Sequence, residues 1–172
     1  LSSVTIGQLA ADHNAVRITD SKLSVNVYAL RASVTESAQT LDNSVAIQDS
    51  AFVGDRSFDV AAVSMLGSET GSLASQQSSV VISNVTLDGQ SSYSIEADQL
   101  QSAISVSSSD ASVILDNFQT DENATGHIYA SRVQGRHNAE ALNGRLDIRH
   151  SSVTGTLRGS LVSLSLLYGD TS

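Results

Sequence analysis

A short pattern of residues recurs five times along this chain of 172 residues, about every 33 positions. Each copy alternates apolar and polar residues around an aspartate, asparagine or histidine, as Val80–Leu87 does around Asn84. The copies begin at Val16, Val45, Val80, Val113 and Leu146, and the steps between them are 29, 35, 33 and 33 residues. A fixed period of this length, made of a strand and a polar corner, is typical of a solenoid. A solenoid offers long lateral surfaces, so the pattern limits the function as well as the fold.

A second repeated strand confirms the period independently. Its copies are Val27–Ala29, Val60–Ala62, Ile95–Ala97, Ile128–Ala130 and, less well, Leu161–Ser163, at steps of 33, 35, 33 and 33 residues. Side chains alternate between the two faces of a strand, so the β-branched residue and the alanine two positions later share one side. We therefore expect an inward column of small residues formed by Ala29, Ala62, Ala97 and Ala130.

The third part of each coil is less regular. Ile104 and Val106 predict a strand, whereas variable loops are expected over residues 67–77 and 135–144. Helix is disfavoured throughout, because the alternation has a period of two and because Ser, Thr, Val and Ile prefer strands or turns to helix interiors. The sequence predicts one all-β domain over residues 1–172, either complete or a fragment of a longer solenoid. Leu161–Tyr168 is expected to form a last strand that covers one end.

The composition excludes several kinds of chemistry. There is no cysteine and no proline. Without cysteine the chain has no disulfide framework and no cysteine-based metal or redox site. Such a composition suits a bacterial secreted protein that crosses membranes unfolded. No apolar run approaches the roughly 18 residues of a membrane-spanning helix, so this segment is not expected to enter a membrane.

The charge is negative and unevenly distributed. The formal net charge of −9 argues against nucleic acid as a partner, because phosphate binding needs a face of Lys and Arg. Residues 1–126 carry 15 Asp/Glu and 4 Lys/Arg, a net −11, whereas residues 127–172 carry 3 and 5, a net +2. The basic end is too sparse for a nucleic-acid platform, but it favours an anionic ligand. Its arginines are Arg132, Arg136, Arg145, Arg149 and Arg158.

The repeated pattern, [VI]-x-[ILV]-x-[DN]-[SV]-x-[LF], resembles that of the right-handed parallel β-helix superfamily over nearly the whole chain. That superfamily includes pectate and pectin lyases, polygalacturonases, phage tailspikes and autotransporter passengers. The resemblance implies a right-handed parallel β-helix of about five coils with about 33 residues per coil. It indicates little about activity, because the same coil supports enzymes, adhesins and scaffolds.

Polar corner residues are expected to stack along one edge of the solenoid. Asparagine and aspartate suit such bends because their side chains bond nearby backbone groups. In the resembled fold, asparagine at this corner commonly forms a ladder that satisfies turn backbone groups. Two of the aspartates could instead bind a calcium ion. The corner residues are Asp20, Asp49, Asn84, Asn117 and His150.

A candidate binding face comes from a repeated Tyr-x-x-Arg pattern on the second strand. Tyr28 precedes Arg31, and Tyr129 precedes Arg132, with Glu96, Asp98 and Asp59 expected on or near the same outer face. Aromatic rings and charged hydrogen-bonding groups in a row are what an elongated glycan needs for stacking and hydroxyl recognition. The alternative is that these are ordinary surface residues paired with acidic neighbours across strands. The two Tyr-x-x-Arg copies belong to the first and fourth coils, so they are not adjacent.

Three histidines, His127, His137 and His150, lie in the basic segment. One near Arg132 could act as a general base on an acidic sugar. Gly126-His127 is faintly similar to the Gly-His-Gly element of polygalacturonases, but Ile128 follows it and the paired Asp-Asp element is absent. Pectate-lyase chemistry lacks its usual partner as well, since the single lysine lies far away in the sequence. No catalytic residue, metal site or cofactor is assigned.

The sequence therefore favours a non-enzymatic module that is secreted or displayed on a bacterial surface, similar to an autotransporter passenger or adhesin. Its lateral face would bind a polysaccharide or host-surface glycan, or another copy of the same chain. The candidate binding residues are Tyr28, Arg31, Glu96, Asp98, Tyr129 and Arg132. The alternatives are a polysaccharide lyase or glycoside hydrolase, including a phage tailspike depolymerase, and a purely structural spacer.

Overall fold

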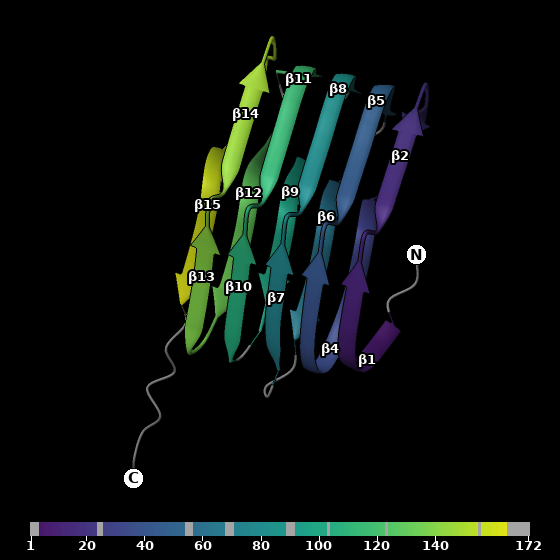
Figure 1. Cartoon of the computed structure of the whole chain (residues 1–172). Coiled ribbons are helices and arrows are strands. Elements are labelled where there is room, and N and C mark those ends of the chain that lie inside the picture. The colour runs from purple at the N-terminus through teal and green to yellow at the C-terminus, as the bar shows by residue number, and fades with distance from the viewer. Residues whose placement is uncertain are drawn as a thin grey trace.

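In the computed structural model the chain coils into a parallel β-solenoid with three strand faces per turn (Figure 1). The structure describes residues 4–23, 26–53, 57–67, 71–88, 92–102, 104–122, 124–154 and 156–164. Within these ranges there are fifteen strands and no helix. All strand pairs are parallel, and each joins one coil to the next.

The first face is a six-stranded sheet in the order β14-β11-β8-β5-β2, with β3 also paired to β5. It carries the pattern found first in the sequence, and Val45, Val80, Val113 and Leu146 lie opposite one another in register. Its strands are β2 (Ala15–Thr19), β3 (Lys22–Leu23), β5 (Ser44–Val53), β8 (Ser79–Asp88), β11 (Ser112–Thr120) and β14 (Arg145–Arg149).

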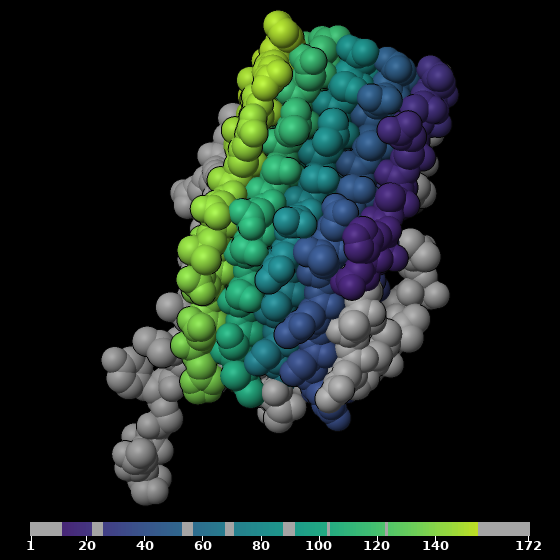
Figure 2. Space-filling view, viewed as in Figure 1, coloured from purple at the N-terminus to yellow at the C-terminus, as the bar shows by residue number. Residues whose placement is uncertain are grey.

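The other two faces form one nine-stranded sheet, because β4 (Val27–Leu41) and β1 (Val4–Asp12) each run through both. The second face continues from the first part of β4 through β6 (Phe58–Gly67), β9 (Ser92–Gln101), β12 (Thr125–Gly135) and β15 (Thr156–Leu164). The third face continues from the last part of β4 through β7 (Ser72–Gln76), β10 (Ser105–Ser109) and β13 (Asn138–Leu142). In the space-filling view the coils form successive bands from purple to yellow (Figure 2).

The all-β parallel solenoid and its period of about 33 residues are confirmed, with about four turns where about five coils were expected. The right-handed sense of coiling stays a prediction. The expected loops over residues 67–77 and 135–144 are wrong in large part, because β7 and β13 lie there. Small polar residues conceal these strands: Ser75 takes an inward position beside Leu73 and is 1% exposed. The end segment forms strand β15 as far as Leu164, and its remainder lies outside the described residues.

The interior contains two apolar clusters that meet within the second face. The predicted alanine column is confirmed, since Ala29 is 9% exposed and Ala62, Ala97 and Ala130 are fully buried. Ala62 belongs to the larger cluster, between the first face and the early part of the second. Val63 belongs to the smaller cluster, between the later part of the second face and the third. Two consecutive inward side chains break the two-residue alternation of a strand, so the second face bends at this point.

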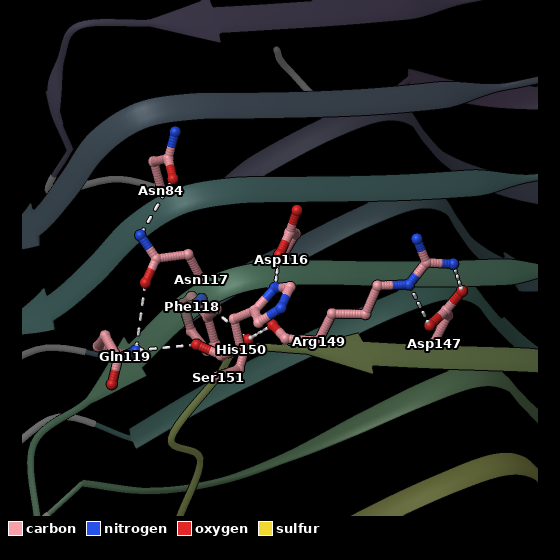
Figure 3. Close-up of polar contacts among 9 residues, drawn as sticks. All are labelled: Asn84, Asp116, Asn117, Phe118, Gln119, Asp147, Arg149, His150 and Ser151. Carbon is pink, nitrogen blue, oxygen red and sulfur yellow. Dashed lines mark hydrogen bonds and ion pairs between the residues drawn. The ribbon is translucent and has the colours of Figure 1, made fainter.

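The corner residues adopt the left-handed backbone conformation. Asp20, Asp49, Asn84, Asn117 and His150 have φ between 48° and 52°. The predicted ladder is present in part: the Asn117 amide donates to Asn84 at 3.0 Å, and the Asn84 amide donates to Asp49 at 2.9 Å (Figure 3). His150 instead contacts the carboxylate of Asp116 at 2.9 Å. A second left-handed row, which the sequence reading missed, has φ between 54° and 58° at His13, Asp42, Gln77, Asp110 and Asn143.

We expect Asn117→Val to lower the free energy of unfolding by about 1–2 kcal/mol, because a β-branched residue is strained at positive φ. Asn117→Gly serves as the matched control. It loses the ladder bonds but accepts the backbone, and it is expected to cost no more than about 1 kcal/mol. Urea unfolding monitored by circular dichroism measures both. Equal midpoints for the two variants would contradict the left-handed assignment.

Candidate functional site

The outer side of the second face carries three rows of side chains, each with one residue per coil. The first row contains Asp59, Ser94 and His127. The second contains Tyr28, Ala61, Glu96 and Tyr129, and the third contains Arg31, Ser64, Gln99 and Arg132. Ala61, Glu96 and Tyr129 are 3%, 1% and 9% exposed, yet they belong to neither apolar cluster. The second row therefore forms a floor, covered by the outward side chains of the rows beside it.

Glu96 is the centre of one polar cluster on this floor. Its Oε1 accepts hydrogen bonds from Ser94 Oγ at 2.9 Å, His127 Nε2 at 2.8 Å and Arg132 Nη1 at 3.4 Å. Its Oε2 is buried without a hydrogen-bond partner among the described residues. The bend explains the reach of Arg132, because the inward pair Ala130 and Ser131 lies between the second and third rows. The cluster combines one carboxylate with a guanidinium and an imidazole.

The two predicted tyrosines are both engaged by neighbouring side chains. The Tyr129 ring lies 4.9 Å from the His127 ring, centroid to centroid, and leaves little surface for a ligand to stack on. The Arg31 guanidinium lies 4.8 Å from the centroid of the half-buried Tyr28 ring. The Tyr28 hydroxyl lies 3.4 Å from Asp59 Oδ2, and burial followed by that carboxylate raises the pKa of Tyr28 above its usual value. The rings therefore position Arg31 and His127.

The expectation that Asp98 lies on this outer face is wrong. It is the second residue of the inward pair at the bend, so counting in steps of two from Glu96 puts it on the wrong side. Asp98 is fully buried, and its carboxylate accepts hydrogen bonds from Ser75 Oγ at 2.8 Å and Ser108 Oγ at 2.5 Å. Burial raises the pKa of Asp98, although the serine hydroxyls oppose the shift. Asp98 belongs to the interior of the solenoid and not to the candidate site.

A hollow of about 290 Å³ lies on the outer side of β4, β6 and β9, next to the Tyr28–Arg31 pair. The Ser64 hydroxyl donates to Gln99 Oε1 at 3.0 Å inside it. The sequence reading missed the neutral members of this hollow. Their signal is the spacing of residues 31, 64, 99 and 132 at steps of 33, 35 and 33, which was available but was not followed through the neutral residues. The outward side chains that line it are Arg31, Ser33, Ser64, Leu66, Gln99 and Gln101.

The basic end of the chain is largely neutralised by its own carboxylates. Arg145 and Arg149 pair with Asp147 at 3.0 and 2.6 Å (Figure 3 shows the second pair), and these contacts lower the pKa of Asp147. Arg132 pairs with Glu96 at 3.4 Å. The positive charge counted in the sequence therefore does not make a free anion site at this end.

The three histidines do not form one cluster. His127 lies on β12, His137 in the turn before β13, and His150 at the corner after β14. The Nε2 atom of His127 contacts both Ser94 and Glu96, at 2.9 and 2.8 Å. A Ser-His-acid relay uses the two ring nitrogens for the two partners, so this arrangement is not such a relay. In the described part of the chain, no group of three His, Cys, Asp or Glu residues is placed to hold a metal ion.

Comparison of the chain with protein-family models, with curated proteins and with solved structures gave no match. The parallel β-solenoid is thus established by the structure itself. Across the described ranges, no helix is long and apolar enough to cross a membrane.

Proposed function

We propose that this protein is a secreted or surface-displayed β-solenoid module, similar to an autotransporter passenger or adhesin, that binds an extended glycan without cleaving it. The observation that carries the proposal is the polar hollow on the outer side of β4, β6 and β9. Hydroxyl, amide and guanidinium groups line it together with the exposed side chain of Leu66, which is 52% exposed. Sugars present both hydroxyl groups and apolar C–H faces, and a mixed lining of this kind complements them.

The length of the third row supports an elongated ligand. Arg31 and Arg132 stand three coils apart in that row, with Ser64 and Gln99 between them. Strands in adjacent coils are about 4.8 Å apart, so the row spans about 14 Å. A polymer that lies along the solenoid axis meets a polar side chain at every step. Because both tyrosine rings are occupied, recognition rests on hydrogen bonds and charge, with little aromatic stacking.

A polysaccharide-cleaving enzyme is the alternative, and the Glu96 cluster is the observation that favours it. A buried carboxylate beside His127 and Arg132 resembles a catalytic group. Glycoside hydrolysis generally needs a second carboxylate across the scissile bond. Asp98, the acidic residue nearest to Glu96 in the sequence, faces the interior. Glycan cleavage by the purified protein would favour this alternative.

We expect Ser64→Phe, which fills the hollow, to weaken glycan binding at least tenfold, a loss of about 1.4 kcal/mol. Gln99→Ala removes an amide donor and is expected to weaken binding severalfold. A glycan array identifies the ligand, and isothermal titration with that ligand measures the variants. Gln48→Ala, on the first face, is the control and should bind as the wild type does. Unchanged binding by Ser64→Phe would remove the hollow from the proposal, and sedimentation of the wild type as an oligomer without glycan binding would favour self-association.

A further inference from the structure

We propose that the hollow selects anionic sugars, and that Arg31 binds their carboxylate or sulfate group. This inference rests on the proposed glycan-binding function and adds the chemical class of the ligand. Arg31 is exposed and is the only charged residue among those that line the hollow. The other polar lining residues are neutral, and no carboxylate lines it.

The state of Arg31 differs from that of the arginines at the basic end. Arg132, Arg145 and Arg149 each pair with a carboxylate of this chain. Across the described residues, Arg31 makes no ion pair within 4.0 Å, and its described contact is the Tyr28 ring. A guanidinium without an acidic partner keeps its hydrogen-bond donors for an incoming anion, which it can bind in a bidentate manner. The free positive charge therefore lies within the acidic part of the sequence.

The surroundings of Arg31 favour a fixed orientation. The Tyr28 ring lies under the guanidinium, and the Tyr28 hydroxyl contacts Asp59 at 3.4 Å. Asp59 is also held by Asn26, whose amide donates to Oδ2 at 3.3 Å. These contacts tie the nearest acidic residue of the first row to Tyr28 and Asn26. Tyr28 is accordingly a positioning residue, and Arg31 is the residue that touches the ligand.

The test compares ligands that differ only in charge. Isothermal titration is carried out with oligogalacturonate and its methyl ester, and with dextran sulfate and dextran. We expect the anionic member of at least one pair to bind at least tenfold more tightly than its neutral partner. The first pair reports on carboxylate and the second on sulfate, so the two sources of anionic charge are distinguished.

Variants of the full chain assign the preference to a residue. Arg31→Gln is expected to lose about 10- to 100-fold in affinity for the anionic member, the range for a charge-assisted hydrogen bond, with little change for the neutral one. Arg31→Lys keeps the charge but not the bidentate geometry, so an intermediate loss is expected. Arg136→Gln removes the same charge from an exposed turn and should bind as the wild type does. Tyr28→Phe should retain the preference, whereas Tyr28→Leu should reduce it.

The outcomes separate the two proposals. Equal binding of the charged and neutral members, with Ser64→Phe weakening both, would overturn the anionic selectivity and leave glycan binding in place. An anionic preference that Arg31→Gln retains, or that Arg136→Gln abolishes, would overturn the assignment to Arg31. Absence of binding to these ligands, and to any member of a broad glycan array, would contradict both proposals. Circular dichroism of each variant establishes that a loss of binding is not a loss of fold.

Discussion

Gly126→Ala is expected to lower the free energy of unfolding by about 3 kcal/mol, near the upper end for an overpacked interior. A Cβ atom at this position would lie 2.3 Å from the Tyr93 carbonyl oxygen and 2.6 Å from its ring. Gly126 and Tyr93 are register partners on β12 and β9, so neither backbone can move alone. The glycine before His127 is thus explained by packing against Tyr93, without any catalytic role. Urea unfolding followed by circular dichroism measures the change.

The neighbouring Thr125→Ala is the matched control, because Thr125 is exposed and its truncation should stay within about 0.5 kcal/mol. A second reading comes from Tyr93 itself. Burial raises its pKa to about 12, and its hydroxyl donates to the Thr154 carbonyl oxygen. Displacement of the ring in Gly126→Ala should return the pKa toward 10, as seen in ultraviolet absorbance during alkaline titration. A variant with wild-type stability and a wild-type tyrosine titration would show that the ring does not occupy this space.

Asp98→Asn is expected to change how stability depends on pH. Burial raises the pKa of Asp98 in the folded state above its value in the unfolded chain. Between the two pKa values the folded state binds more protons, so this residue's contribution to stability is present at low pH and is lost as pH rises through the folded pKa. Each unit of difference is worth about 1.4 kcal/mol. The amide variant does not ionise, so its stability relative to the wild type should increase with pH from about 4 upward.

The difference between wild type and variant is the quantity to measure, by urea unfolding at closely spaced pH values. Other carboxylates act in the opposite direction: Asp147, whose pKa is lowered by Arg149, favours the folded state above its unfolded pKa and loses that contribution in acid. Asp147 is common to both proteins, so subtraction removes it. Asp110→Asn, at an exposed corner, is the control and should show no such trend. Parallel curves for wild type and Asp98→Asn would contradict a buried, proton-binding Asp98.

The sequence predicts those features in which one type of residue recurs at one step. The alanine column and the Asp/Asn corner were found because each position keeps its chemistry from coil to coil. The second left-handed row was missed because His13, Asp42, Gln77 and Asp110 share a backbone conformation but not a residue type. Asp98 was misplaced because the bend after Ala97 shifts the alternation by one residue. Nothing in the local sequence marks that bend, which arises where two apolar clusters meet.

The candidate site was only partly predictable for a related reason. Arg31, Arg132 and Glu96 were identified by type, since charged residues are noticeable in a polar surface. Ser64 and Gln99 are ordinary residues of this chain, and their importance appears only when the register aligns them with the two arginines. The occupation of both tyrosine rings likewise depends on side-chain contacts across coils and bends. No spacing rule contains that information.

The stacking of one residue per coil has a consequence for the distances between charged groups. Arg31 and Arg132 belong to one row of the same sheet, so their separation is a whole number of coil steps of about 4.8 Å each. Gain or loss of a complete coil between them would lengthen or shorten that distance by one step while leaving each arginine in its own local setting. The solenoid thus behaves as a graduated ruler, on which a lineage can match a repeating polymer by changing the number of coils and leaving the side chains as they are.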